Sequence, residues 1–386
     1  MFYRIIYFIA VLPFFMQCTP VQKIEVKSIE WKIATQIPAP DNTTAALGLA
    51  GPVAGIHQNK LIIGGGANFP GAMPWLGGSK KYYDDVYIFS LDKNDSVSFL
   101  KTVKLPNSIA YSAVCSTPIG IIYAGGENEA GLTDKVSLIH WDEQTNNVVI
   151  KDLPALPFAA TNASLTFYNN NIYLVGGETS TGVSDGFLQL DLDKLSAGWT
   201  ALPPLPKPLS HAVITVQTNG NQQLIYVMGG RKKIPGSTSE LYSSNFSYDF
   251  DTNKWTENKS LPYALSAGTG MATGTHAILM FGGDKGETFH KTETLIAAIA
   301  NEKDEAKKEQ LNLQKTALQF THPGFSKEIL MYNTVSDEWS MVDSIPFDVP
   351  VTTVAIPYDH KVIIPSGEIK AGVRTPQVLS GVIHFK

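Results

Sequence analysis

The composition of the chain favours one large all-β domain over a charged or nucleic-acid-binding protein. Of its 386 residues 44% are apolar and only 17% are charged, while 32 glycines and 23 prolines suit many short strands and turns. The net charge of -5 and the pI near 5.9 argue against a surface for nucleic acid or anionic membranes, and leave a neutral or locally recognised anionic small molecule as the expected ligand.

Residues 1–18 have the pattern of a secretory signal peptide. Arg4 precedes an apolar run over residues 5–15, which is short for a membrane span. Cys18 stands where a bacterial lipoprotein carries its lipidated cysteine, although Phe15, Met16 and Gln17 match poorly the small residues usual before it. We expect export to the periplasm or outer membrane of a bacterium and leave a lipid anchor at Cys18 open. We expect the other cysteine, Cys115, to be a small buried apolar residue that forms no disulfide.

Two patterns recur about every fifty residues, which indicates a β-propeller. In the first, a large apolar residue stands seven positions before the proline of Leu-Pro or Ile-Pro, as in Trp31 with Pro38, Phe99 with Pro106, Ile150 with Pro157, Trp199 with Pro206, Trp255 with Pro262 and Trp339 with Pro346. In the second, a glycine pair closes an apolar run, at Gly65-Gly66, Gly125-Gly126, Gly176-Gly177, Gly229-Gly230 and Gly282-Gly283, with Ser366-Gly367 as a degenerate sixth.

Each repeat is interpreted as a blade of four antiparallel strands. In the fourth blade these are residues 210–216, residues 224–228 before the glycine pair, residues 244–249 and the strand of Trp255. The last repeat has no Trp strand, so the strand at residues 24–33 is expected to complete it and close the ring. The prediction is a six-bladed kelch-type β-propeller over residues 19–386, closed by the N-terminal strand.

A helical insertion is expected in blade five. The first glycines of the pairs lie 60, 51, 53 and 53 residues apart, but 84 residues separate Gly282 from Ser366. Residues 290–320 lack Gly and Pro and are rich in Ala, Glu, Lys and Leu, and removing these 31 residues restores a spacing of 53. We expect either a lid over the functional face or a solvated helix with no role in turnover.

The functional face is expected where the loops after the glycine pairs emerge together with those after the Trp strands. The unusual loops are residues 67–85, 231–243, 284–328 and 368–377. The last contains Ser366-Gly367-Glu368-Ile369-Lys370-Ala371-Gly372-Val373-Arg374-Thr375.

That segment closely resembles the Gly-Glu-x-Lys-x-Gly-x-Arg-Thr segment of the N-acetylneuraminate epimerases, or sialic acid mutarotases, which are exported six-bladed kelch propellers. Residues 61–85 and 111–131 resemble the two family blades that follow it. The Glu-to-Arg blade comes last here, as in the circularly permuted branch of that family, and permutation is tolerated where chain ends meet at the surface.

The resemblance implies interconversion of the α and β anomers of N-acetylneuraminate without cofactor or metal. It assigns Glu368 as the general base and Arg374 as the residue that holds the sugar carboxylate or polarises the anomeric centre. Glu127 and Glu178 also follow glycine pairs, so a rim residue bonding nearby backbone is the alternative for any of these glutamates.

Further substrate-binding candidates are Arg231, Asn68, His211, His290 and Glu178, with a solvated or core role as the alternative. The histidines show no metal-ligand spacing, and no Ser-His-Asp or phosphate-loop signature is present. The competing function is a non-catalytic propeller that binds a glycan or a protein. A copper oxidase is not expected, because the sequence has no recognisable set of Tyr, His and Cys ligands for copper. The exact sugar and the oligomeric state are left open.

Overall fold

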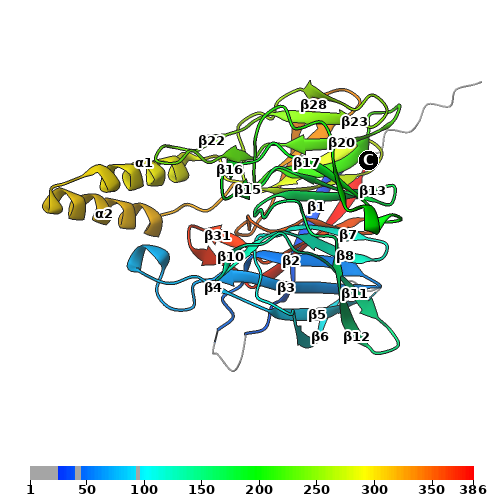
Figure 1. Cartoon of the computed structure of the whole chain (residues 1–386), viewed down its shortest axis with the longest axis horizontal. Helices are drawn as coiled ribbons and strands as arrows, with labels where there is room; N and C mark the ends of the chain where they lie inside the picture. The colour runs from blue at the N-terminus through cyan, green and yellow to red at the C-terminus, as the bar shows by residue number, and fades with distance from the viewer. Residues whose placement is uncertain (1–24, 40–44, 93–95) are drawn as a thin grey trace, which may run out of the picture.

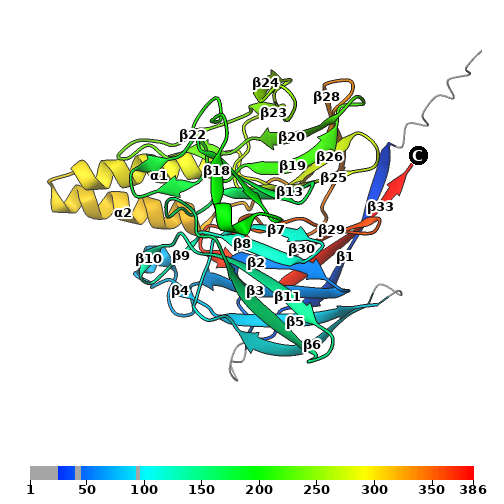
Figure 2. The ribbon, with the colours of Figure 1, turned by 45° about the vertical axis from the view of Figure 1, so that its right-hand side comes forward.

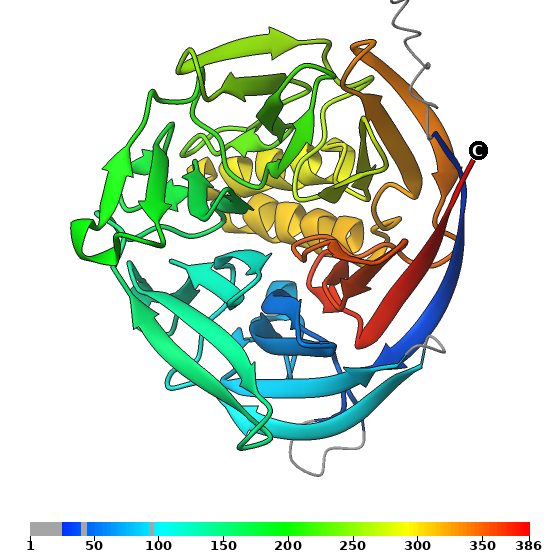
Figure 3. The same cartoon turned by 90° about the vertical axis from the view of Figure 1, so that its right-hand side faces the viewer.

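The computed structural model describes residues 25–39, 45–92 and 96–386, and within them six antiparallel sheets form a closed ring (Figure 3). The proposed signal peptide and Cys18 lie outside the described residues. In the part of the chain that is described, no helix is long and apolar enough to span a membrane. Two helices project from one face of the ring (Figure 1).

In blades one to five the four main strands are paired in chain order. Blade one comprises β2 (Ala50–His57), β3 (Lys60–Asn68), β5 (Asp85–Leu91) and β6 (Val97–Lys104). Blade two comprises β7 (Ala113–Thr117), β8 (Gly120–Ala124), β11 (Val136–Asp142) and β12 (Asn147–Leu153). Blade three comprises β13 (Ser164–Tyr168), β14 (Asn171–Val175), β17 (Phe187–Asp191) and β18 (Trp199–Ala201). Blades four and five comprise β19 (Val213–Thr218), β20 (Gln223–Met228), β23 (Asn245–Asp249) and β24 (Lys254–Asn258); and β25 (Thr269–Thr273), β26 (Ala277–Phe281), β27 (Glu328–Asn333) and β28 (Glu338–Ser344).

The N-terminal strand closes the ring, as the missing Trp strand of the last repeat predicts. Blade six runs in the order β1 (Val26–Gln36), β33 (Gln377–Phe385), β30 (Lys361–Pro365) and β29 (Ile356–Tyr358). The blue β1 and the red β33 lie side by side in Figure 2. Trp31 packs edge-on against Phe281 of blade five, with ring centroids 5.8 Å apart. The two ends of the described chain thus form one sheet and bury one core with the neighbouring blade.

On the helix-bearing face, short additional strands follow the second strand of every blade except blade five. They are β4 (Lys81–Tyr82), β9 (Glu127–Asn128) with β10 (Gly131–Leu132), β15 (Glu178–Thr179) with β16 (Gly182–Val183), β21 (Arg231–Lys232) with β22 (Glu240–Leu241), and β31 (Glu368–Lys370) with β32 (Val373–Arg374). Short 3-10 turns add η1 (Pro74–Leu76) and η2 (Leu195–Ala197). In blade five two helices stand where the other blades have these strands.

The helical insertion is a hairpin of two helices, which corrects the expectation of one helical segment over residues 290–320. Helix α1 (Glu287–Asn301) is followed by α2 (Glu305–Phe320). The break comes at Asp304, whose side chain accepts hydrogen bonds from the backbone N–H groups of Ala306 and Lys307. An aspartate in this position caps a new helix rather than continuing the old one.

A closed hoop of backbone hydrogen bonds surrounds the ring axis on the same side. Each blade contributes one residue, and each N–H donates to the carbonyl oxygen of the hoop residue in the blade before it, over 2.7–3.1 Å. All six residues have positive φ, between 49° and 61°; they are Gly51, Tyr111, Asn162, His211, Ala267 and Thr352. The hoop explains why the first strand of blade four begins at Val213, whereas residue 210 was predicted.

The glycine pairs let neighbouring blades approach closely beside this hoop. A Cβ on Gly176 would lie 2.1 Å from the carbonyl oxygen of Leu209 in the next blade, and Gly177 N–H donates to that oxygen over 2.9 Å. Ser366 replaces the first glycine in blade six with a φ of 54°. Its buried hydroxyl accepts from Leu49 N–H and donates to Thr375 O, so polar contacts fix this substituted position.

Candidate functional site

A cavity of about 480 Å³, here called the upper cavity, opens above the hoop on the helix-bearing face. Its wall brings together titratable side chains from all six blades or the loops between them, namely Lys80, Tyr111, Glu127, Glu178, His211, Arg231, Asp284, His322, Glu368 and Arg374. The loops after glycine pairs and after Trp strands meet at this wall, as expected from the antiparallel blades. It is therefore the candidate active site.

One register position supplies half of these side chains. In blades two to six, the first residue after the glycine pair or its Ser-Gly equivalent forms an isolated β-bridge with the residue just before the hoop: Glu127 with Ala110, Glu178 with Thr161, Arg231 with Ser210, Asp284 with Ser266, and Glu368 with Val351. All five of these post-glycine residues line the upper cavity. The repeat itself therefore aims one side chain per blade at the axis, and the identity of that residue sets the local charge.

Glu368 and Arg374 face each other as cross-strand partners of β31 and β32. Glu368 Oε1 accepts the Gly372 N–H over 2.8 Å, and Glu368 Oε2 lies 3.4 Å from Arg374 Nη2. The Arg374 side chain is 4% exposed and its guanidinium lies 4.8 Å above the Phe69 ring. Its Nε and Nη1 have no hydrogen-bond partner among the described residues. A buried cation with unused donors is costly alone and favours an anionic ligand.

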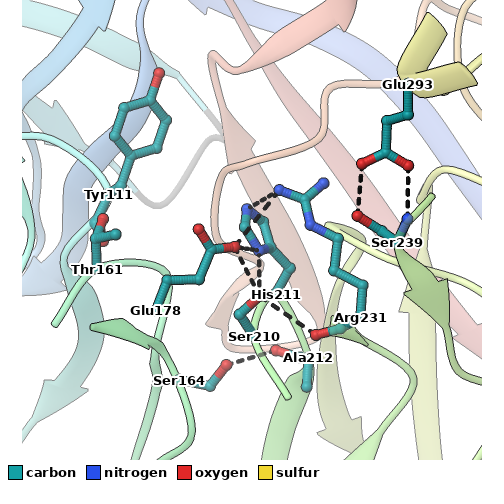
Figure 4. Close-up of polar contacts among 10 residues, drawn as sticks. All are labelled: Tyr111, Thr161, Ser164, Glu178, Ser210, His211, Ala212, Arg231, Ser239 and Glu293. Atoms are coloured by element: carbon teal, nitrogen blue, oxygen red, sulfur yellow. Dashed lines mark hydrogen bonds and ion pairs between the residues drawn. The ribbon is translucent and has the colours of Figure 1, made fainter. Parts of the chain in front are cut away.

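On blades three and four, Glu178, Ser210, His211 and Arg231 form a continuous polar network (Figure 4). Arg231 Nη2 lies 3.2 Å from His211 Nε2, and His211 Nδ1 lies 3.0 Å from Ser210 Oγ, which donates to Glu178 Oε1 over 2.9 Å. Burial, assisted by Arg231 and Lys233, holds the pKa of His211 well below its ordinary value. Because arginine only donates, neutral His211 accepts at Nε2 and carries its proton on Nδ1.

Lys80, Tyr82 and Tyr111 surround Glu127 on the next part of the wall, and sequence reasoning did not propose Lys80. Glu127 Oε1 accepts from Tyr82 OH over 2.7 Å and lies 3.1 Å from Lys80 Nζ, which also sits 4.8 Å from the Tyr111 ring centroid. Burial opposes the charge of Lys80, but Tyr111, Glu127 and Tyr82 outweigh it and raise the lysine's pKa. Lys80 is thus a fixed cation at the cavity wall.

The helical hairpin forms part of the same wall. Thr288, Phe289 and Thr292 of α1 and Gln319 of α2 line the cavity. Phe289 covers the Arg231 guanidinium at 4.9 Å, and Phe320 at the end of α2 packs edge-on against Trp75 in the loop of blade one, with centroids 5.4 Å apart.

A polar latch also ties α1 to the loop of blade four. Glu293 accepts the Ser239 N–H over 2.7 Å and the Ser239 hydroxyl over 2.6 Å, as Figure 4 shows. His290 Nε2 lies 2.9 Å from Ser239 O and is therefore occupied in the latch. The residues that line the cavity do not include His290, so the structure does not place it where a substrate-binding residue is expected.

Asn68 is likewise absent from the cavity wall. Its side chain is buried, with Nδ2 donating to Gly48 O and Oδ1 accepting from Tyr83 OH, both over 2.8 Å. In blade one Ala67, paired with Ala50, occupies the register position of the glutamates. Asn68 is one residue further along the strand, where side chains point to the other side.

His322 follows α2 and lines the cavity, and no sequence motif marked it. Its Nδ1 accepts the Gly324 N–H over 3.0 Å, which places the proton of the neutral ring on Nε2. Burial lowers the pKa of His322, while Asp284 and Glu368 act in the opposite direction. One feature of the sequence pointed to His322, namely its position just after the helical insertion that was expected to cover the site.

Comparison with known proteins gives a family and a fold. A family model described as N-acetylneuraminate epimerase matches residues 17–149 and 153–386. The N-acetylneuraminate epimerase of Yersinia pestis (strain Pestoides F) is 27% identical over 246 residues, covering 62% of this chain and 59% of that protein. That of Salmonella paratyphi B (strain ATCC BAA-1250 / SPB7) is 26% identical over 226 residues, covering 58% of this chain and 56% of it.

The chain thus aligns with less than two thirds of the length of these curated relatives. A solved structure described as "Structure of YjhT" covers 92% of this chain and 100% of its own, with a TM-score of 0.62 and 14% identity. That likeness shows a shared propeller fold.

Proposed function

The chain belongs to the N-acetylneuraminate epimerase family, and we propose that it interconverts the α and β anomers of N-acetylneuraminate in the upper cavity. The observation that carries the proposal is the pairing of Glu368 with the buried, under-occupied Arg374 in that cavity. A carboxylate beside a guanidinium with unused donors suits a sugar that bears both an acidic hydroxyl and a carboxylate on one carbon.

In the proposed reaction Glu368 acts as the general base. It takes the proton of the anomeric hydroxyl, the electron pair forms the C2 carbonyl, and the bond from C2 to the ring oxygen breaks. Protonated Glu368 then returns this proton to the released ring oxygen, which leaves the open keto acid and an ionised Glu368. Rotation about the bond next to the carbonyl exposes its other face, and the reverse steps then close the other anomer. Gly372 N–H donates to Glu368 Oε1 and Arg374 Nη2 lies 3.4 Å from Oε2, so the protein fixes the position of the carboxylate at the cavity wall.

Arg374 is proposed to bind the sugar carboxylate. The Phe69 ring lies against the guanidinium, with its centroid 4.8 Å from Cζ, and a planar guanidinium matches a carboxylate in two parallel hydrogen bonds. Lys80 and Arg231 add positive charge elsewhere on the wall and are proposed to contact the remaining oxygen atoms of the sugar. His211 holds Arg231 rather than the substrate, since its Nε2 already faces that guanidinium.

We further propose that α1 and α2 form the lid expected from the sequence. Two contacts support it, because Phe289 at the start of α1 covers Arg231 and Phe320 at the end of α2 packs against Trp75 in the loop of blade one. A lid excludes water and holds the sugar while the ring is open. Export through residues 1–18, anchoring through Cys18 and the circular permutation stay predictions of the sequence.

The decisive experiment follows anomer exchange of N-acetylneuraminate by NMR, with and without purified protein that begins at residue 19. We expect faster exchange that is lost in Glu368→Gln while sugar binding remains. Absence of acceleration for this and other keto acid sugars, with binding retained, would instead support a non-catalytic glycan-binding propeller.

A further inference from the structure

A second polar hollow, here called the lower groove, lies on the face of the ring opposite the helices. It has a volume of about 610 Å³ and is formed where blades three and four meet. Its walls come from the turn between β13 and β14, the turn between β19 and β20, and the turn between β23 and β24. These turns lie at the ends of the strands away from the glycine pairs, so the upper cavity and the lower groove share no residue.

The lower groove is lined mainly by amides and aromatic rings. Its amide side chains are Asn169, Asn171, Gln189, Gln222, Gln223 and Asn253. Its aromatic side chains are Tyr168, Tyr173, Tyr248 and Phe250. An amide offers a donor and an acceptor side by side, which matches adjacent sugar hydroxyls, and an aromatic ring packs against the apolar C–H face of a pyranose.

Internal contacts fix the orientation of several of these groups. Gln189 Nε2 donates to Asn171 Oδ1 over 2.7 Å, and Asn171 Nδ2 donates to Asn169 O over 2.8 Å. Tyr248 OH donates to Asn253 Oδ1 over 2.8 Å. Each amide keeps further donor or acceptor capacity beyond these bonds, so the network pre-orients polar groups that a ligand can use.

The aromatic side chains form a single packed cluster beneath the amides. The rings of Tyr168 and Phe250 are stacked, with centroids 5.0 Å apart and an angle of 23°, and Tyr173 lies 5.5 Å from Phe250. Tyr173 and Tyr248 are buried, whereas Tyr168 and Phe250 are half-buried and reach the groove. A rigid aromatic base with oriented amides resembles an organised binding site more than a loose set of surface loops.

Charge separates this groove from the upper cavity. The described residues that line the groove include Asp249 and Asp251 but no Lys, Arg or His. Asp249 Oδ1 accepts the N–H groups of Asp251 and Thr252, over 2.8 and 3.3 Å. An anionic sugar would meet only carboxylates and neutral groups, without a cation to balance its charge.

We propose that the lower groove binds a neutral oligosaccharide and that this second site is independent of catalysis. The enzyme would thereby hold an uncharged part of a glycan on one face while the upper cavity handles a free sugar acid on the other. The inference rests on the groove alone and stands whether or not the upper cavity catalyses mutarotation.

The test measures binding of neutral hexasaccharides built from glucose, galactose or N-acetylglucosamine to the purified protein, by saturation-transfer NMR and calorimetry. Gln189→Glu keeps the size of the side chain but replaces its donor N–H group with an acceptor. We expect it to weaken binding about tenfold, the effect of one lost hydrogen bond with its partner unsatisfied. Gln144→Glu, the same change at an exposed position in the turn between β11 and β12 of blade two, serves as the control and should leave binding unchanged.

Two further readouts keep the test decisive. Melting temperatures of the variants must match the parent, and Tyr168→Ala should weaken binding independently of Gln189. Binding that survives both changes, or no binding of any neutral hexasaccharide at millimolar concentration, would overturn the proposal. So would equal binding of N-acetylneuraminate at the groove in an Arg374→Gln background. Anomer exchange should be unaffected by Gln189→Glu, which separates this result from failure of the proposed reaction.

Discussion

The upper cavity contains two pairs of glutamate and arginine that differ in how they are held. Glu368 and Arg374 belong to one small hairpin of blade six, 3.4 Å apart, with one carboxylate oxygen held by a backbone N–H. Glu178 and Arg231 come from neighbouring blades, 3.7 Å apart, and are joined through a serine and a histidine. The residue types are the same, but their surroundings are not.

We infer from this difference that the pair within the hairpin takes part in the reaction, whereas the pair between blades mainly supports the cavity wall. In the pair between blades, the Ser210 hydroxyl bonds Glu178 and His211 accepts from Arg231, so much of the capacity of each is used within the protein. In the hairpin pair, Nε and Nη1 of Arg374 find no hydrogen-bond partner in the described part of the chain, and Glu368 Oε2 lies 3.4 Å from Arg374 Nη2. Arg231 leaves one buried donor, Nε, without a partner among the described residues, whereas Arg374 leaves two, so the hairpin pair has the larger capacity for a substrate.

The largest expected effect compares the two glutamates. Glu368→Gln keeps the acceptor for Gly372 N–H but removes the base, so we expect anomer exchange to slow by about 10²- to 10⁴-fold. Glu178→Gln preserves the shape of its network and should slow exchange less than about tenfold, as a lost neutral contact would. Both rates are measured by NMR, with sugar affinity as the control. Equal losses in the two variants would contradict the separation.

The two arginines give the next largest contrast. Arg374→Lys replaces a planar fork by a single ammonium, and we expect the KM for N-acetylneuraminate to rise about 10- to 100-fold, the range of a charge-assisted hydrogen bond. Arg231→Lys should raise KM less, since its main partners are protein groups. Steady-state kinetics on both variants decide the order. A larger effect at Arg231 would move the carboxylate site to blade four.

A smaller effect is expected where the lid meets blade one. Phe320→Ala removes the edge-on contact with Trp75 and should raise KM about two- to tenfold, the worth of one aromatic pair. Leu313→Ala serves as the control, because Leu313 lies on the same helix and is about as exposed as Phe320, at 60% against 59%, but forms no aromatic pair. If deletion of residues 287–320 leaves KM and turnover unchanged, the helices have no role as a lid.

The smallest effect concerns protonation of the supporting network. The lowered pKa of His211 means that the unfolded chain binds its proton first as pH falls below the ordinary value of 6.5, so stability is lost on acidification. His211→Gln should reduce this loss by about 1 kcal/mol between pH 7.5 and 5.5. Denaturant unfolding at both pH values measures it, and His57 and His322, which have lowered pKa values too, stay constant in the comparison. If the loss of stability between the two pH values is the same in His211→Gln, the folded protein does not lower the pKa of His211.

The repeat made most of the fold predictable because few residues can replace its parts. Gly176 has no room for a Cβ, and Trp31 fills a gap that blade six cannot fill from its own C-terminal strands, so the period and the ring closure were confirmed. The cap at Asp304 was missed because composition alone shows helix content but not its division into two helices.

The candidate site could be predicted only where the repeat controls side-chain direction. Glu368 and Glu178 follow glycine pairs and therefore reach the cavity, whereas Asn68 is displaced by one residue and turns away. Lys80 and His322 come from long loops that reach the cavity wall through tertiary contacts, such as that of Lys80 with the Tyr111 ring. No local pattern encodes those contacts, so these two residues were visible only in three dimensions.

The hoop has a consequence for how such a site can change over evolution. All six of its N–H groups and all six of its carbonyl acceptors are used by one another, so the backbone of the cavity floor has no N–H left to donate to a ligand. Only the side chains at these positions remain to be varied, and in this chain they range from Gly51 to Tyr111 and His211. The hydrogen bonds of the hoop hold the backbone at these positions in the left-handed region. Replacing one non-glycine side chain by another can therefore change which ligand the cavity binds, while the six backbone hydrogen bonds stay intact.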